Sequence, residues 1–199
     1  MVKNGETTNL PESKLLARKE AHIAMAGLSL AQAVKDSRAV CHLILESDAW
    51  QQADQVLLYF PISGEIDIDP LIKKGLEVGK GIALPRFSQK NNNYEACAIP
   101  NLGELVVGKF GIPEPSLNCQ KMNTKQLDLA IVSGLAFDGL GGRLGRGGGF
   151  FDRLLADVSA KKCGVCFDQQ VQRDVPVERH DVKMDMIATP SGWLVPQPS

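Results

Sequence analysis

A glycine-rich stretch between an apolar run and a helical pattern is the feature that most limits what this chain can fold into. Residues 127–133 are apolar and branched, which is typical of a buried strand, and residues 151–161 have the apolar spacing of a helix. Between them, residues 144–151 hold four glycines, with Arg143 before them and Arg146 among them. Glycines let backbone N–H groups converge, and arginines add planar donors for phosphate oxygens. The stretch is therefore predicted to be an anion-binding loop that joins a strand to a helix.

The spacing of these glycines does not fit the two common phosphate-binding motifs. No G-x-G-x-x-G register matches them, and no Gly-Lys-Ser/Thr sequence follows. A flexible surface loop with solvated arginines is the alternative that composition leaves open. The strand before the loop and the helix after it favour anion binding, because a helix directs the positive end of its dipole at the loop that precedes it.

Predicted helices and strands alternate along the rest of the chain, which indicates an α/β fold with a largely parallel sheet covered on both faces. Residues 1–10 are predicted to be a disordered extension, and residues 11–199 a single folded domain. The strands at 55–60, 81–85 and 127–133 are expected to be central. The expected helices cover 11–26, 29–45, 70–78 and 151–161, and the expected strands cover 55–60, 81–85, 94–98 (at an edge or antiparallel), 127–133, 162–167 and 186–189.

Charge and cysteine content exclude several classes of function. The net charge of −1 in 199 residues provides no basic field for nucleic acid or membrane. The sequence has neither a long apolar run nor a signal peptide, so a cytoplasmic protein is expected. Five cysteines, an odd number, argue against a secreted disulfide framework. Cys163 and Cys166 fall within a predicted strand and are interpreted as structural, and the three histidines form no catalytic pattern.

Five charged residues are candidates for a site. Lys14 and Arg18 are spaced to project from one face of the first helix, although a solvated face is the commoner use of such a pair. Glu65 follows a strand beside a glycine, where α/β sheets bind ligands, or it is simply exposed. Asp152 and Asp185 could together hold Mg²⁺ with phosphate oxygens, or they could be ordinary helix-start and turn residues.

These residues resemble those of the 5-formyltetrahydrofolate cyclo-ligase family, also called methenyltetrahydrofolate synthetases. The resemblance rests on residues 134–138, Gly-Leu-Ala-Phe-Asp, followed by residues 143–153, Arg-Leu-Gly-Arg-Gly-Gly-Gly-Phe-Phe-Asp-Arg. It extends in order from Lys14 to Thr189. The supporting segments are Lys14 with Arg18, Glu65 with Asp67, residues 84–86, residues 110–115, residues 175–178 and Met184 with Asp185.

The resemblance implies an open three-layer α/β/α fold and an ATP- and Mg²⁺-dependent reaction. In the family, ATP phosphorylates the formyl oxygen of 5-formyltetrahydrofolate, and N10 then attacks the activated carbon to give 5,10-methenyltetrahydrofolate, ADP and phosphate. Such a reaction depends on positioning and charge neutralisation, so the lack of a nucleophilic side chain is expected. The implied substrate carries one or several glutamates, and the protein is expected to be a monomer.

The resemblance also assigns residues, with Arg146 and Lys14 as the catalytic cations. ATP is expected on Lys14, Arg18, Arg143, Leu144, Gly145, Arg146, Gly147, Gly148, Gly149, Phe150 and Phe151. The folate is expected on Arg18, Phe60, Glu65, Phe110, Arg146, Gly147, Gly148, Gly149 and Phe150. Magnesium is expected on Asp152 and Asp185.

One departure from the family pattern concerns Phe150 and Phe151, where the family usually has two tyrosines. A missing hydroxyl donor costs about 1 kcal/mol, so weaker or altered ligand binding is expected. Two other functions remain alternatives: a non-catalytic regulator that binds folate or nucleotide on the same fold, and an isomerase or transferase that holds the phosphate of its own substrate. The second alternative needs an acid–base pair near the loop and gives Lys14 and Arg18 no task.

Overall fold

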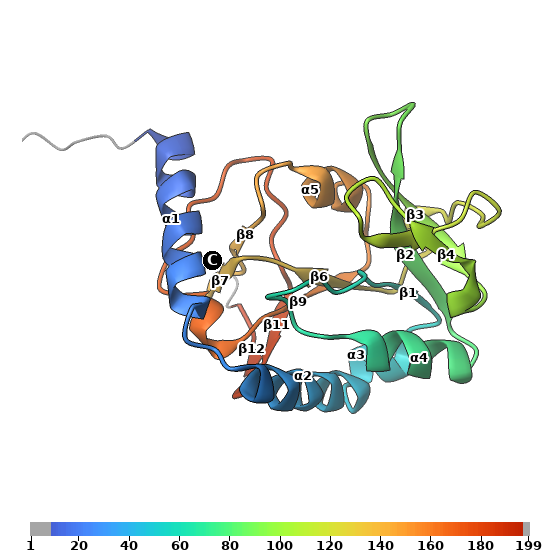
Figure 1. Ribbon diagram of the computed structural model, residues 1–199, viewed down its shortest axis with the longest axis horizontal. Coiled ribbons are helices and arrows are strands. Elements are labelled where there is room, and N and C mark those ends of the chain that lie inside the picture. The colour runs from blue at the N-terminus through green and yellow to red at the C-terminus, as the bar shows by residue number, and fades with distance from the viewer. Residues whose placement is uncertain (1–8, 197–199) are drawn as a thin grey trace, which may run out of the picture.

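A seven-stranded sheet forms the centre of the computed structural model, which describes residues 9–196. Its strand order is β12-β11-β9-β6-β1-β2-β3 (Figure 1). The inner five strands are parallel, and the two edge strands, β3 and β12, run antiparallel to their neighbours. The strands of this sheet are β1 Gln55–Leu57, β2 Gly81–Ser88, β3 Asn93–Ile99, β6 Leu129–Ser133, β9 Lys161–Val165, β11 Met186–Thr189 and β12 Gly192–Leu194.

Two small sheets and five helices complete the fold of residues 9–196. One small sheet has the order β10-β7-β8, and the other is the hairpin β4-β5. Within residues 9–196, no helix is long and apolar enough to cross a membrane. The remaining elements are α1 Leu10–Met25, α2 Leu30–Leu45, α3 Asp48–Gln52, α4 Asp69–Glu77, α5 Phe150–Leu155, β4 Leu105–Val107, β5 Pro113–Pro115, β7 Ala136–Asp138, β8 Arg143–Leu144, β10 Val171–Gln172 and the 3₁₀ turns η1 Leu102–Glu104, η2 Thr124–Gln126 and η3 Asp168–Gln170.

The central sheet is buried on both faces, which explains why its strands are apolar throughout. Because successive side chains of a strand point to opposite faces, Val56 and Leu58 pack in the core on one face and Leu57 packs in the core on the other. Helices α2, α3 and α4 cover the first face, and α5 covers the second (Figure 1). The three-layer α/β/α fold expected from the sequence is confirmed.

Helix α1 lies outside these layers, beside the small sheet that contains β7 and β8 (Figure 1). Its Ala17 and Ala21 are buried in a third, small core with Leu144 and Val175. Alanine allows close approach of the helix to that sheet, while Lys14 and Arg18 lie on the same side of the helix. This packing brings the first helix next to the glycine-rich loop.

The order of the parallel strands creates a crevice between β1 and β6. From β1 the chain passes through α4 to β2 on one side, whereas from β6 it passes through α5 to β9 on the other side. Because α4 and α5 cover opposite faces of the sheet, the connections leave a gap at the carboxyl ends of β1 and β6. Ligands of open α/β sheets bind at such a point.

Several local expectations from the sequence need correction. The predicted strand at 127–133 is β6, but it does not lead directly into the loop, because the β7–β8 hairpin comes first. The predicted helix at 151–161 is a single short helix, α5; Val158 beyond it is buried in irregular chain. Of the strands expected to be central, β6 and β1 are, whereas β2 is next to an edge. Residues 1–8 of the predicted disordered extension lie outside the described residues, and Leu10 opens α1.

Candidate active site

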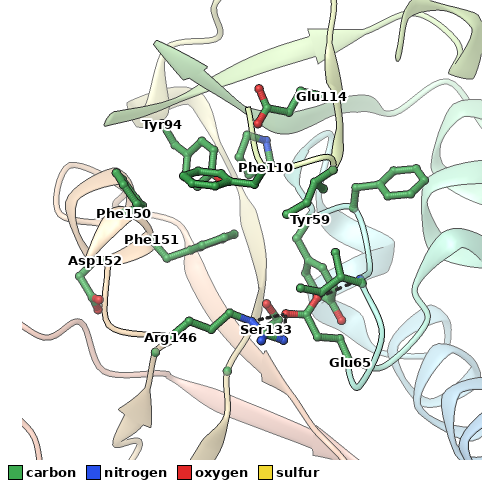
Figure 2. A pocket seen from close by; sticks show the side chains of 18 of the residues that line it. Tyr59, Glu65, Tyr94, Phe110, Glu114, Ser133, Arg146, Phe150, Phe151 and Asp152 are labelled. Carbon is green, nitrogen blue, oxygen red and sulfur yellow. Dashed lines mark hydrogen bonds and ion pairs between the residues drawn. The ribbon is translucent and has the colours of Figure 1, made fainter. Parts of the chain in front are cut away.

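A pocket of about 640 Å³ occupies the crevice at the carboxyl ends of β1 and β6. This volume is within the usual range for small-molecule sites. Figure 2 shows an aromatic side with Tyr94, Phe110 and Phe150, and a charged side with Glu65 and Arg146. The lining residues used below are Phe60, Glu65, Tyr94, Phe110, Glu114, Ser133, Arg143, Gly145, Arg146, Gly148, Gly149, Phe150, Phe151 and Asp152.

Glu65 and Arg146 form an ion pair across the pocket. The Nε and Nη2 atoms of Arg146 donate to Oε1 of Glu65 at 3.3 and 3.1 Å. Oε2 of Glu65 accepts a hydrogen bond from the backbone N–H of Ile62, so the carboxylate is held in place from two sides. The Glu65 side chain is 8% exposed and that of Arg146 is 47% exposed. Arg146 is therefore the partner whose side chain a ligand can contact and reorient.

Arg143 and Asp152 form a second ion pair at the start of α5. Nη2 of Arg143 donates to Oδ1 of Asp152 at 2.7 Å, and Nη1 donates to the carbonyl oxygen of Ser133 at 3.2 Å. Within the described residues, the buried Nε–H of Arg143 has no acceptor. An unsatisfied buried donor costs about 1–3 kcal/mol, and a ligand oxygen would relieve that cost. The pair thus has both an open donor and a carboxylate at the pocket wall.

The glycine-rich loop, residues 145–149, connects β8 to α5 and contacts α1. Nε of Arg18 donates to the carbonyl oxygen of Gly145 at 3.0 Å. Gly147 and Gly149 have φ of +103° and +62°, and residues other than glycine rarely adopt such positive φ values. Helix α5 has only six residues, so its dipole is weak and the arginines supply most of the positive charge.

The aromatic side of the pocket is a cluster of four rings, Phe87, Tyr94, Phe110 and Phe150. Their neighbouring centroids are 5.5–6.0 Å apart, mostly in edge-to-face contact. Tyr94 and Phe87 face each other because β2 and β3 pair them directly. Burial, followed by the charges of Glu114 and Glu65, raises the pKa of Tyr94 above its ordinary value, so its hydroxyl stays protonated at neutral pH. A flat ligand can pack against this cluster.

Lys14 lies outside the pocket lining, in an ion-paired cluster with the segment before β11. Its Nζ is 2.7 Å from Oε2 of Glu178 and 2.5 Å from Oδ2 of Asp181. Burial alone would lower the pKa of Lys14, but hydrogen bonds and charge from Asp181 and Glu178 raise it above 10.5. Burial alone would raise the pKa of Asp181, but Lys14 and the backbone N–H of Glu178 hold it below 3.8. The lysine is therefore charged but already neutralised.

Comparison with known proteins identifies the family. The family model described as "5-formyltetrahydrofolate cyclo-ligase family" matches residues 11–190. This chain belongs to that family. It is thus an enzyme of the ligase class, and the resemblance that the sequence motifs indicated is confirmed.

Relatives match over most of the chain. A probable 5-formyltetrahydrofolate cyclo-ligase of Caenorhabditis elegans is 29% identical over 191 residues, which cover 89% of this chain and 93% of that protein. The 5-formyltetrahydrofolate cyclo-ligase of Escherichia coli strain K12 is 34% identical over 149 residues, which cover 70% of this chain and 79% of that protein. The solution structure of 5,10-methenyltetrahydrofolate synthetase of Aquifex aeolicus has a TM-score of 0.83 at 31% identity and covers 94% of each chain.

The structure brings together most of the residues that the cyclo-ligase resemblance suggested. Phe60, Glu65, Phe110, Arg143, Gly145, Arg146, Gly148, Gly149, Phe150, Phe151 and Asp152 all line the pocket. Gly147 lies next to Arg18, since a Cβ atom on this glycine would be 3.5 Å from the Arg18 guanidinium carbon. The Leu144 side chain is buried in the small core below α1.

Asp185 is not brought to Asp152 in the pocket. Its Oδ2 accepts a hydrogen bond of 2.7 Å from the backbone N–H of Lys162 at the amino end of β9. Asp185 also precedes β11, so it lies at the amino ends of two parallel strands, whereas Ser133 and the pocket lie at the carboxyl end of β6. The expected pairing of Asp152 with Asp185 in one metal site is therefore absent from this structure's pocket.

Sequence reasoning missed three contributors to the site. Tyr94 lines the pocket, Phe87 packs against it because β3 pairs with β2, and Glu114 lies buried at the pocket wall. Oε2 of Glu114 accepts a hydrogen bond from the backbone N–H of Phe87. The available signal was two aromatic residues on either side of the asparagine run at 91–93, because a hairpin there would place them on one face of a sheet.

Proposed function

We propose that this chain converts 5-formyltetrahydrofolate to 5,10-methenyltetrahydrofolate, with ATP as phosphoryl donor and Mg²⁺ as its counter-ion. The single observation that carries the proposal is one pocket that joins the Glu65–Arg146 pair, the glycine-rich loop and an aromatic wall in a chain of the cyclo-ligase family. The names of the relatives state the folate reaction, and the geometry supports the roles of individual residues.

The reaction balances without a covalent bond to the protein. The formyl oxygen attacks the γ-phosphorus of ATP and ADP leaves with the bonding electrons. N10 of the folate then attacks the activated carbon and loses its proton, and the carbon–oxygen bond breaks to release phosphate. The first step transfers a phosphoryl group between oxygen atoms, and the second forms a carbon–nitrogen bond while phosphate leaves. Both steps develop charge on phosphate oxygens, so the protein's task is to position the reactants and to neutralise that charge.

Each charged group of the pocket has a task in this scheme. Glu65, which accepts hydrogen bonds from Arg146 and Ile62, would accept N–H groups of the pterin ring. Arg146 is exposed enough to leave Glu65 and bind the phosphoryl oxygens. Arg143 would use its free Nε–H for ATP, and the backbone N–H groups of the loop would add further donors.

The residues present fit a magnesium ion in part. Asp152 supplies a carboxylate at the pocket wall, and Mg²⁺ commonly takes one or two carboxylates together with phosphate oxygens and water. Bound there, the ion would neutralise phosphate charge during transfer. Asp152 already accepts hydrogen bonds from Arg143 and Val182 at Oδ1, which would orient its Oδ2 for the metal. Asp185 would need a different arrangement of its segment to contribute.

Lys14 is proposed as a cation for ATP that must first exchange its acidic partners. In the structure Glu178 and Asp181 neutralise it, and Arg18 is the residue of α1 that reaches the loop.

Folates with one or several glutamates are proposed as substrates, and the enzyme is proposed to act as a monomer in the cytoplasm. Five free, buried cysteines agree with a reducing compartment.

The test is an absorbance assay for methenyltetrahydrofolate with 5-formyltetrahydrofolate, ATP and Mg²⁺. We expect turnover that a chelator abolishes, and about 100-fold slower turnover for Arg146→Ala, because removal of one preorganised donor for a developing charge costs that much. Arg38→Ala, an exposed arginine on α2, is the matched control and should behave as wild type.

Two outcomes would overturn the proposal. Folded protein that binds the folate tightly without turnover would point to the non-catalytic regulator instead. Normal turnover by Arg146→Ala would remove the loop from the reaction.

A further inference from the structure

Tyr94 brings a free hydroxyl group to the lining of the pocket. The sequence has two tyrosines, and both line the pocket. Tyr59 is buried and uses its hydroxyl within the protein, as a donor to the carbonyl oxygen of Ile66 at 2.7 Å. Tyr94 is half-buried, and among residues 9–196 its hydroxyl has no hydrogen-bond partner. The other aromatic residues of the lining are phenylalanines, which have no such group.

The ring of Tyr94 is held in place by its neighbours on β2 and α5. Strand pairing puts Tyr94 opposite Phe87, with their ring centroids 6.0 Å apart in edge-to-face contact. The centroids of Phe150 and Phe151 are 5.5 and 6.2 Å from that of Tyr94. The hydroxyl oxygen of a tyrosine lies on the axis of its ring, so a ring that is held on several sides fixes the place of this oxygen as well.

The Tyr94 hydroxyl is a donor that works across the pocket from an acceptor. Tyr94 belongs to the aromatic side, which lies opposite Glu65 and Arg146 (Figure 2). Burial, followed by the charges of Glu114 and Glu65, raises the pKa of Tyr94. The Glu65 carboxylate therefore acts on this hydroxyl, which stays protonated at neutral pH and can donate a hydrogen bond.

These two groups ask for different atoms of one ligand. Glu65 accepts from N–H groups, whereas Tyr94 donates to an oxygen. Phosphate oxygens are better matched by Arg143 and Arg146, because charged donors form stronger hydrogen bonds with anions. A neutral hydroxyl suits a neutral carbonyl oxygen. In 5-formyltetrahydrofolate the N–H groups at one end of the pterin adjoin the 4-oxo oxygen, and the formyl group on N5 is next to that oxygen.

We propose that the Tyr94 hydroxyl binds a carbonyl oxygen of the folate, either the 4-oxo or the formyl oxygen, and thereby makes the pocket selective for folates that carry it. The inference rests on the proposed function, because it assumes that the pterin lies between Glu65 and the aromatic side. A site that uses a partly buried hydroxyl discriminates against a ligand without the matching oxygen, since the donor then loses water and gains no partner.

Tyr94→Phe tests the hydroxyl because it keeps the ring and its packing. Calorimetric titration without ATP, so that no turnover occurs, gives the Kd of 5-formyltetrahydrofolate. We expect Tyr94→Phe to raise this Kd about two- to tenfold, the range for one neutral hydrogen bond. The KM for ATP should stay within about twofold of wild type, because the phosphates are assigned to the arginines. A merely structural role of Tyr94 would change both constants.

Two analogues show which oxygen accepts the bond. The 4-amino-4-deoxy analogue of 5-formyltetrahydrofolate lacks the 4-oxo oxygen, and 5-methyltetrahydrofolate lacks the formyl oxygen. For each folate, the ratio of the Kd of Tyr94→Phe to that of wild type isolates the contribution of the hydroxyl, as in a double-mutant cycle. This ratio should fall to about one for the analogue that lacks the accepting oxygen and stay high for the other.

Ser88→Ala is the matched control in the same hairpin. Ser88 pairs with Asn93, one position along from the pair of Phe87 and Tyr94, and adjacent residues of a strand point to opposite faces. Its hydroxyl accepts only a long hydrogen bond, 3.4 Å, from the backbone N–H of Asn91. Loss of this hydroxyl should leave the Kd of all three folates and the KM for ATP as in wild type.

The outcomes separate this inference from the reaction itself. An unchanged Kd for 5-formyltetrahydrofolate in Tyr94→Phe overturns the inference and leaves the proposed reaction standing. The same is true of an equal ratio for all three folates, or of an equal rise in the KM for ATP. Binding of the folates without turnover by wild type overturns the reaction alone, and a wild-type protein that binds none of them overturns both.

Discussion

At the scale of single residues, the glycine-rich loop depends on backbone conformations that differ from one glycine to the next. Gly147 and Gly149 have positive φ, whereas Gly145 and Gly148 do not. A Cβ atom on Gly147 would also be 3.5 Å from the guanidinium of Arg18, and one on Gly145 would meet the Arg143 guanidinium at 3.4 Å. The backbone conformation therefore requires glycine at 147 and 149 but not at 145.

Gly147→Ala is expected to destabilise the loop by about 1–2 kcal/mol, the cost of a side chain at positive φ, and to raise the KM for ATP. Gly145→Ala is the matched control within the same loop, and it should keep the wild-type KM within about threefold. Urea unfolding and initial-rate kinetics measure both effects. Equal kinetics for the two variants would show that the conformation at Gly147 does not matter for the site.

At the scale of elements, α1 is joined to the rest of the molecule by charge as well as by packing. Lys14 donates hydrogen bonds to Glu178 and Asp181, while Arg18 donates one to the loop at the carbonyl oxygen of Gly145. The ion-paired cluster therefore sets where α1 lies, and α1 in turn places Arg18 against the loop. His180 is a further neighbour, 3.6 Å from Glu178 and 3.9 Å from Asp181.

Lys14→Met is expected to reduce the free energy of unfolding by about 3 kcal/mol, because it leaves two partly buried carboxylates without their cation. Lys19→Met, an exposed lysine on the same helix, should change it by less than about 0.5 kcal/mol. Urea unfolding at pH 7 measures both. Wild-type stability in Lys14→Met would show that the cluster does not hold α1.

The same cluster predicts a dependence of stability on pH. Because the pKa of Asp181 is lower in the folded protein than its ordinary value of 3.8, its contribution is complete above pH 3.8 and is lost as the pH falls through the folded value. Because the pKa of Lys14 is raised above 10.5, its contribution is complete below pH 10.5 and is lost as the pH rises further. The stability difference between wild type and Asp181→Asn should thus narrow as the pH falls below 4. A difference that stays constant down to pH 3 would contradict this.

At the scale of the whole molecule, two apolar cores on opposite faces of one sheet enclose the cysteines. All five thiols are free and buried. Burial raises the pKa of Cys41 to about 12 and that of Cys97 to about 11, and it raises the pKa of Cys163 to about 12. The Cys163–Cys166 pair expected to be structural therefore lacks the lowered pKa of a redox pair.

A chromogenic thiol reagent at pH 8 should react with none of these cysteines rapidly in the native protein, and with all five after unfolding in guanidinium chloride. Burial limits access of the reagent to all five thiols, and the raised pKa values of Cys41, Cys97, Cys163 and Cys166 also disfavour the reactive thiolate. Time courses under the two conditions provide the measurement. Rapid reaction of one or more thiols in the native protein would show that those cysteines are not buried.

The amino-acid sequence by itself determined the alternation of strands and helices, the glycine-rich loop and the charged residues around it, because these are local patterns of spacing and residue type. The order of the strands in the sheet could not be predicted from these local patterns, since strands that pair lie far apart in the chain. Tertiary structure alone decided that Lys14 meets Glu178, 164 residues away, and that Asp185 lies at the end of the sheet opposite the pocket. It also decided that Phe87, Tyr94, Phe110 and Phe150 pack in one aromatic cluster. Parallel strands place their carboxyl ends together, so the site exists only once the sheet has formed.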